Sequence, residues 1–137
     1  MKRSANAIWK GNLKEGNGHI TSKSTAINNM QYSFSSRFEE GVGTNPEELI
    51  AAAHAGCFSM AFSAELGKAG ITPDSIETSA FITFENGTLS ESHLVSKATV
   101  PGGDKAAIEI AANDAKAGCP ISKSLNMKIS MELTIVN

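Results

Sequence analysis

The chain has 137 residues, carries a formal net charge of −2 at pH 7 and contains 19% charged residues. A chain of this length predicts a single domain, residues 1–137. The weakly acidic balance speaks against nucleic acid and acidic membranes as partners, because both require a basic surface. Residues 1–9 carry positive charge but lack the apolar segment of a secretory signal, and the longest uncharged apolar run, residues 49–53, is too short to span a membrane. We therefore expect a soluble, cytoplasmic protein.

The first third of the chain predicts β-strands. Residues 8–13 precede a Gly-Asn-Gly turn at residues 16–18, and residues 19–24 can return as the second strand of a hairpin. Residues 32–37 then alternate between larger and smaller side chains with the period of a strand, which places Arg37 at the end of that strand.

A long helix follows. Residues 44–48 combine a polar cap, a proline in the first turn and two acidic residues near the positive end of the helix dipole. The helix should run from about Pro46 to Gly67 and is apolar almost all round between residues 49 and 62. A helix of this kind is buried on several sides.

The rest of the chain alternates between strands and helices. The predicted elements are strands at residues 76–85 and 90–100 around an Asn-Gly turn, a helix from Asp104 to Gly118, a short helical turn at 121–125 and an alternating strand at 127–135. The element order βββ-α-ββ-α-β predicts an α+β fold with an antiparallel β-sheet packed on two main helices.

The two cysteines are the first candidates for chemistry. Cys57 lies in the middle of the long helix, where a cysteine is most simply a small buried apolar side chain. Cys119 comes directly before Pro120 at the start of a helical turn, where amide donors lower a thiol pKa, although a plain helix cap explains it equally well. In a reducing cytosol such cysteines are free, catalytic or metal-bound. The two cysteines lie 62 residues apart, which is too far for a CxxC motif. They are also not a zinc pair, because a zinc site needs three or four ligands with short local spacings.

Two charged or titratable side chains could assist a thiol. His54 lies three residues before Cys57 on the same helix face and could be its base or a metal partner, although packing is the more common role. Arg37 could stabilise a thiolate and hold a peroxide oxygen.

Surface roles explain the charged residues around that arginine equally well. Arg37 could pair with Glu39 or Glu40 at the surface, which contributes little to stability. Glu47 and Glu48 could act only as acidic residues of the first helical turn.

Two segments carry a family resemblance. Residues 43–61 contain the helix start and the cysteine as GTNPEELIAAAHAGCFSMA, and residues 117–122 read AGCPIS. Together with Arg37-Phe38-Glu39 they resemble the OsmC/Ohr family of osmotically inducible and organic-hydroperoxide-resistance peroxidases, and the predicted element order fits that family along the whole chain.

The resemblance implies a catalytic cycle with two cysteines. Cys57 would attack an organic hydroperoxide as a thiolate and become a sulfenic acid, and Cys119 would condense with it to a disulfide. A small dithiol or another thiol would reduce that disulfide. Arg37 would activate Cys57 and bind the peroxide, and Glu47 would orient Arg37 through a two-pronged pair. The resemblance implies no metal, flavin or haem.

The resemblance also implies an intertwined homodimer of the OsmC branch. In the Ohr branch the catalytic arginine lies on an early strand, and the only earlier arginine here, Arg3, precedes the first strand. Glu47 lies a helical rise of about 15 Å before Cys57, so we expect part of the Arg37–Glu47 pair to come from the partner subunit. Gly56 replaces the usual alanine, at a cost of about 0.5–1 kcal/mol within a helix.

Aromatic and methionine side chains could form an apolar entry to the thiol. The candidates are Phe34, Phe38, Phe58, Met60 and Phe62. Such an entry predicts a preference for alkyl or lipid hydroperoxides over hydrogen peroxide.

Two other functions compete with a peroxidase. One is a hydrolase or acyltransferase that uses Cys57 with His54 as its base. The other is a non-enzymatic dimer whose cysteines bind a metal or sense oxidants.

Overall fold

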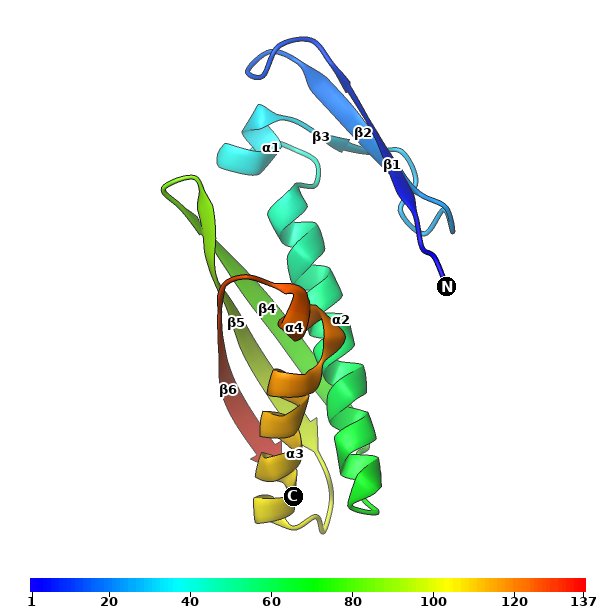
Figure 1. Cartoon of the computed structure of the whole chain (residues 1–137), viewed down its shortest axis with the longest axis vertical. Helices are drawn as coiled ribbons and strands as arrows, with labels where there is room; N and C mark the ends of the chain where they lie inside the picture. The colour runs from blue at the N-terminus through cyan, green and yellow to red at the C-terminus, as the bar shows by residue number, and fades with distance from the viewer. The chain divides into compact units, whose positions relative to one another are not determined.

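The computed structural model describes all residues from 1 to 137, and the chain forms two compact units, residues 1–49 and residues 50–137 (Figure 1). The first unit contains an antiparallel three-stranded sheet, β1 (Ala5–Lys10), β2 (Asn17–Ser22) and β3 (Met30–Tyr32), in the order β1-β2-β3. It also contains the short helix α1 (Phe34–Phe38) and the first turn of the long helix α2 (Pro46–Lys68).

The first hairpin turns earlier than the sequence predicts. Lys10 pairs with Asn17, so the connection comprises residues 11–16, and the expected turn residues Asn17 and Gly18 belong to β2. Gly18 is required for packing: a Cβ there would lie 2.5 Å from the Tyr32 ring and 2.9 Å from the Trp9 ring. The prediction of a turn at residues 16–18 was wrong because the glycine accommodates two aromatic rings whose centroids are 5.4 Å apart.

The strand predicted over residues 32–37 is also wrong beyond Tyr32. Ser33 and Ser36 form a reciprocal capping box, in which the Ser36 amide donates to Ser33 Oγ at 3.2 Å and the Ser33 amide donates to Ser36 Oγ at 2.8 Å. This motif satisfies free amide groups at a helix start. Arg37 therefore lies in the last turn of α1 rather than at the end of a strand.

The second unit contains the rest of α2 and the elements predicted after it. These are β4 (Ser75–Glu85), β5 (Thr88–Thr99), α3 (Lys105–Gly118), α4 (Pro120–Ser124) and β6 (Lys128–Val136). Asn86 and Gly87 have φ values of 52° and 73° and form the tight β4–β5 turn. The mixed α+β class is confirmed.

The sheet topology differs from the expected single antiparallel sheet. The strands form two separate sheets, and in the second of them, ordered β4-β5-β6, β6 pairs parallel to β5. A parallel neighbour requires a long crossover, and α3 and α4 supply it between β5 and β6 (Figure 1). A purely antiparallel arrangement was wrong for this reason.

The hydrophobic core lies within the second unit. It joins Phe58, Phe62 and Leu66 of α2 to residues of β5 and α3, and the remaining members are Leu94, Ala98, Val100, Ile108, Ala111, Ala112 and Ala115. Phe58 and Phe62 are completely buried in this core, whereas the side chain of Met60 is 77% exposed. The prediction that Phe58 and Phe62 line an entry was therefore wrong.

Helix α2 is buried on only one side within the chain. Its buried residues are His54, Phe58, Phe62 and Leu66, and the opposite face includes Gly56 and Met60. By length and composition alone, α2 could also cross a membrane, since an 18-residue window of it has a mean hydropathy of 1.3. Within the chain, 22% of that window is buried, and Phe58, Phe62 and Leu66 of this helix join the hydrophobic core.

Candidate active site

The two cysteine sulfurs are in contact. Cys57, half-buried in α2, and Cys119, completely buried between α3 and α4, share a thiol–thiol hydrogen bond with their Sγ atoms 2.9 Å apart. Both are free thiols. The fold thus brings together two sulfurs that lie 62 residues apart in sequence, which is the arrangement required for disulfide formation.

Cys119 lies at the joint of two helices. It caps the C-terminus of α3 and the N-terminus of α4, with φ −57° and ψ 130°, and Pro120 is the first residue of α4. Its Sγ accepts a hydrogen bond from the Ser122 amide at 3.5 Å. The cap-plus-proline pattern predicted this local structure.

The surroundings shift the pKa values of the two thiols in opposite directions. Burial raises the pKa of Cys57, the hydrogen bond with Cys119 raises it further, and the Ile121 amide lowers it in part. Burial also raises the pKa of Cys119, but hydrogen bonds from Cys57, Ser122 and Ile121 outweigh burial and leave that pKa below its ordinary value. These surroundings favour the thiolate on Cys119 over the thiolate on Cys57.

Arg37 and Glu47 form a two-pronged ion pair inside the first unit. Arg37 Nη2 donates to Glu47 Oε1 at 2.8 Å, and Arg37 Nε donates to Oε1 at 3.1 Å and to Oε2 at 3.3 Å. The predicted contact between Arg37 and Glu47 thus exists. Both members come from one chain, so the expectation that part of the pair comes from a partner subunit was wrong.

Hydrogen bonds between α1 and the start of α2 explain why the pair closes within one chain. Ser36 Oγ donates to the Thr44 carbonyl oxygen at 2.7 Å, and Asn45 Nδ2 donates to the Ser36 carbonyl oxygen at 3.1 Å. Ser36 and Thr44 are both buried. These contacts hold the end of α1 against the first turn of α2, where Glu47 lies.

Glu48 has a different role from its neighbour. Its amide donates to Asn45 Oδ1 at 2.7 Å, and its carboxylate accepts a hydrogen bond from Thr44 Oγ1 at 2.9 Å. Glu48 therefore belongs to the cap of α2, as the first-turn interpretation predicted, whereas Glu47 is engaged with Arg37.

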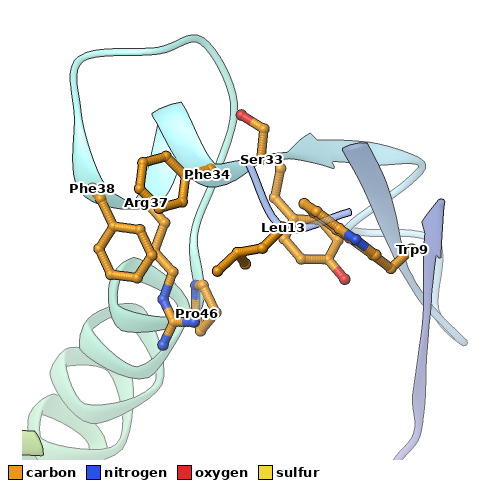
Figure 2. A pocket seen from close by; sticks show the side chains of 8 residues that line it. Trp9, Leu13, Ser33, Phe34, Arg37, Phe38 and Pro46 are labelled. Atoms are coloured by element: carbon orange, nitrogen blue, oxygen red, sulfur yellow. The ribbon is translucent and has the colours of Figure 1, made fainter. Parts of the chain in front are cut away.

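An apolar pocket adjoins Arg37. It has a volume of about 270 Å³ and is lined by Trp9, Leu13, Tyr32, Ser33, Phe34, Arg37, Phe38 and Pro46. Figure 2 shows Leu13 projecting into this space between Trp9 and Phe34. The Phe34 and Phe38 rings lie 5.0 Å apart, and the Arg37 guanidinium carbon lies 5.0 Å from the centre of the Phe38 ring, which is within cation–π range.

The sequence analysis predicted only part of this pocket. Phe34 and Phe38 line this pocket beside Arg37, whereas the prediction was an entry beside the Cys57 thiol. Trp9, Leu13 and Tyr32 were missed. Trp9 and Tyr32 were detectable only through the strand register that places both beside Gly18.

His54 does not contact a cysteine through its ring nitrogens. Nδ1 lies 2.6 Å from Ser92 Oγ and Nε2 lies 2.7 Å from Ser122 Oγ, with the whole side chain buried. Burial lowers the pKa of His54, which favours the neutral ring. Both nitrogens are therefore engaged with serine hydroxyls, and the proposed Cys57–His54 dyad is not formed. No group of three or more histidine, cysteine or acidic side chains could hold a metal ion.

The sequence of this chain matches a known protein family and a curated relative. The family model described as OsmC-like protein matches residues 39–134. Peroxiredoxin OsmC of Escherichia coli (strain K12) is 42% identical over 136 residues, which cover 96% of this chain and 95% of that protein.

Solved structures show the same fold. The OsmC-like protein from Mycoplasma pneumoniae matches with a TM-score of 0.78 and 16% identity, covering 100% of this chain and 99% of that one. The organic hydroperoxide resistance protein OhrB of Bacillus subtilis matches with a TM-score of 0.65 and 23% identity, covering 96% and 97%. The matched family model and the identity to a curated relative, over a chain whose two motif cysteines are in contact, show that this protein belongs to the OsmC family.

Proposed function

We propose that this protein is a thiol-dependent peroxidase that reduces organic hydroperoxides to alcohols with Cys57 and Cys119. The observation that carries the proposal is the 2.9 Å separation of the two sulfurs. Relatives named Peroxiredoxin OsmC and organic hydroperoxide resistance protein support the same reaction class.

The cycle consists of two sulfur displacements. The Cys57 thiolate attacks one peroxide oxygen, the O–O bond breaks, and the other oxygen leaves with a proton as the alcohol. The resulting Cys57 sulfenic acid is attacked by Cys119, which forms the disulfide and releases water. A small dithiol or another thiol then reduces the disulfide by exchange. This cycle needs no cofactor.

Arg37 supplies a cation for the Cys57 thiolate. The guanidinium stabilises the thiolate and the leaving oxygen, and Glu47 fixes its orientation through the two-pronged pair. Glu47 and Cys57 lie on the same helix, separated by a rise of about 15 Å. We therefore assign the intact Arg37–Glu47 pair of one subunit to the partner subunit's Cys57.

Apolar side chains that the single chain leaves exposed support a homodimer. No apolar side chain of residues 1–49 is fully buried, and Ile8, Leu13 and Val42 are 52%, 62% and 82% exposed. The outer face of α2 carries Met60 together with Gly56, where an added Cβ would meet nothing within 4 Å. Intertwining two copies would cover both surfaces.

The pocket beside Arg37 receives the organic group of the hydroperoxide. Its wall is mainly aromatic and aliphatic, and the guanidinium lies at its border. An alkyl or aryl group gains burial free energy there, which hydrogen peroxide cannot. The preference for organic hydroperoxides follows.

The cellular setting matches this chemistry. Two free thiols that must be reduced in every cycle suit the reducing cytoplasm. There the protein serves as an antioxidant enzyme of the stress response.

The decisive experiment follows the consumption of cumene hydroperoxide with dithiothreitol. Wild type should turn over, Cys57→Ser should be inactive, and Cys119→Ser should stop after one equivalent unless outside thiols reduce the sulfenic acid directly. Mass spectrometry after one equivalent of peroxide should show the Cys57–Cys119 disulfide in wild type. A single oxidation without turnover would indicate a redox sensor and refute the proposal.

A further inference from the structure

His54 is a completely buried polar side chain that joins three elements of the second unit. From α2 it reaches Ser92 on β5 through Nδ1 at 2.6 Å and Ser122 on α4 through Nε2 at 2.7 Å. A neutral imidazole carries one N–H donor and one acceptor nitrogen. The two serines can therefore be satisfied in two ways, which differ in the nitrogen that holds the proton.

Ser122 connects this histidine to the sulfur of Cys119. Its amide donates to Cys119 Sγ at 3.5 Å, which places the Ser122 side chain beside the same sulfur. A hydrogen bond from that side chain is one of the causes that lower the pKa of Cys119. A serine hydroxyl has one proton. If His54 Nε2 accepts that proton, the sulfur loses this donor; if Nε2–H donates to Ser122 Oγ, the hydroxyl proton is available to the sulfur.

Ser92 can complete the second arrangement. When Ser92 Oγ–H donates to His54 Nδ1, the ring proton lies on Nε2, and the donors run from Ser92 through His54 and Ser122 to Cys119. Hydrogen bonds aligned in one direction polarise and strengthen one another. A negative charge on the sulfur favours this direction over its reverse.

We propose that His54 is a positioning residue for Cys119: its Nε2 proton holds the Ser122 hydroxyl so that the hydroxyl donates to the Cys119 sulfur and stabilises the thiolate that resolves the Cys57 sulfenic acid. The inference rests on the proposed resolving role of Cys119. In that step the Cys119 electron pair forms the S–S bond, the S–O bond of the sulfenic acid breaks, and the departing hydroxide takes up the proton that Cys119 released, giving water.

The primary test measures the two sulfur steps separately. One equivalent of cumene hydroperoxide is added without reductant, samples are quenched with an alkylating reagent, and the Cys57 sulfenic acid and the disulfide are quantified by mass spectrometry. In Ser122→Ala, sulfenic acid should form at the wild-type rate and the disulfide should form about 3-fold more slowly. A higher pKa of Cys119 reduces the thiolate fraction, and the greater nucleophilicity of the more basic thiolate offsets part of that loss. Ser122→Thr, which keeps the hydroxyl, should restore the rate.

A matched control separates this effect from general loss of packing. Ser96 is also a buried serine on the inner face of β5, and its hydroxyl hydrogen-bonds to Thr78 rather than to His54. Ser96→Ala therefore removes a comparable buried hydrogen bond and should leave the rate of disulfide formation unchanged. His54→Gln should slow it as Ser122→Ala does.

A second readout reports the Cys119 thiol directly. In a Cys57→Ser background, the rate of iodoacetamide alkylation of Cys119 is followed against pH, and Ser122→Ala should move the midpoint upward by about one pH unit. The two helices that Cys119 joins each carry one lysine in the last turn, Lys116 and Lys123. Both lysines remain in every variant, so they do not contribute to the difference.

The outcomes distinguish this inference from the proposed function. If wild type forms no Cys57–Cys119 disulfide, the two-cysteine peroxidase proposal fails. If wild type forms it and Ser122→Ala and His54→Gln form it equally fast, with an unchanged alkylation midpoint, the peroxidase stands and the role of His54 is refuted. An equal slowing in Ser96→Ala would refute it as well.

Discussion

The guanidinium of Arg37 and the carboxylate of Glu47 meet through two nitrogens, at 2.8 Å from Nη2 and 3.1 Å from Nε, and so join the last turn of α1 to the first turn of α2. A two-pronged contact fixes the plane of the guanidinium, which a single ammonium contact cannot do. The pair is partly exposed, with Arg37 at 36% and Glu47 at 13% side-chain exposure, so it contributes little to stability. Its proposed role is to orient the guanidinium.

Arg37→Lys tests that orientation. The variant keeps the positive charge and loses the planar fork, so we expect kcat/KM for cumene hydroperoxide to fall about 10²-fold, with unfolding little changed. Arg3→Lys is the matched control, because Arg3 is the only other arginine and its hydrogen bond is to the adjacent Lys2 carbonyl. Activity retained by Arg37→Lys, or lost equally in both variants, would argue against an oriented guanidinium.

The pocket is tested with Leu13→Ala. Leu13 lines the pocket from an exposed loop, so truncating it removes apolar contact with the substrate without creating a core cavity. KM for cumene hydroperoxide should rise about 5- to 10-fold, the equivalent of about one to two buried methylenes at about 0.8 kcal/mol each, because Leu13 is 62% exposed and loses only part of its burial. Hydrogen peroxide kinetics should stay the same. Val42→Ala, at an exposed site of the same unit outside the pocket, should change neither.

The outer face of α2 is tested with Met60→Glu. A carboxylate at this 77% exposed methionine is harmless to a single chain and unfavourable in an apolar interface. Analytical ultracentrifugation should show wild type as a dimer and the variant as a monomer. Ile110→Glu, at an exposed isoleucine of α3, is the control and should remain dimeric. A monomeric wild type would overturn the dimer proposal.

His54 predicts a loss of stability at acidic pH. Burial lowers the pKa of His54 below its ordinary value of 6.5, so the unfolded chain takes up a proton near that pH and the folded chain does so only at lower pH. The free energy of unfolding should be highest above pH 6.5 and decline as the pH falls toward the folded pKa, by at most about 1.4 kcal/mol per pH unit.

Urea unfolding at several pH values between 7.5 and 5 measures this decline. His54→Gln should show a shallower decline than wild type over that range, because glutamine does not titrate. His19→Gln, a substitution on β2 in the other unit, should retain the wild-type slope. Parallel curves for wild type and His54→Gln would contradict the prediction.

Local signals predicted the elements that depend on neighbouring residues. The cap and proline at residues 44–48 predicted the start of α2, and Asn86-Gly87 predicted the β4–β5 turn. The alternation over residues 32–37 misled because the Ser33–Ser36 capping box forms a helix there. A period of two across so short a segment does not outweigh a satisfied helix start.

Relationships between distant segments could not be predicted from the residues alone. The pocket depends on the register that places Trp9 and Tyr32 on either side of Gly18, and the parallel placement of β6 depends on where the α3–α4 crossover returns the chain. The contact of Cys57 with Cys119 was expected through the family resemblance, not through spacing. The serine partners of His54 lie 38 and 68 residues away and carried no local signal.

Because Cys119 lies between α3 and α4, a bond to Cys57 should change the stability of the fold during the redox cycle. A bond from Cys119 to Cys57 would close a loop of about 62 residues that contains β4, β5 and α3. Closing a loop of that length restricts the unfolded chain by roughly 4 kcal/mol in the chain-entropy model. The oxidised protein should therefore melt at a higher temperature than the reduced one. Each catalytic cycle would then pass through a more stable disulfide form, which the reductant must reduce.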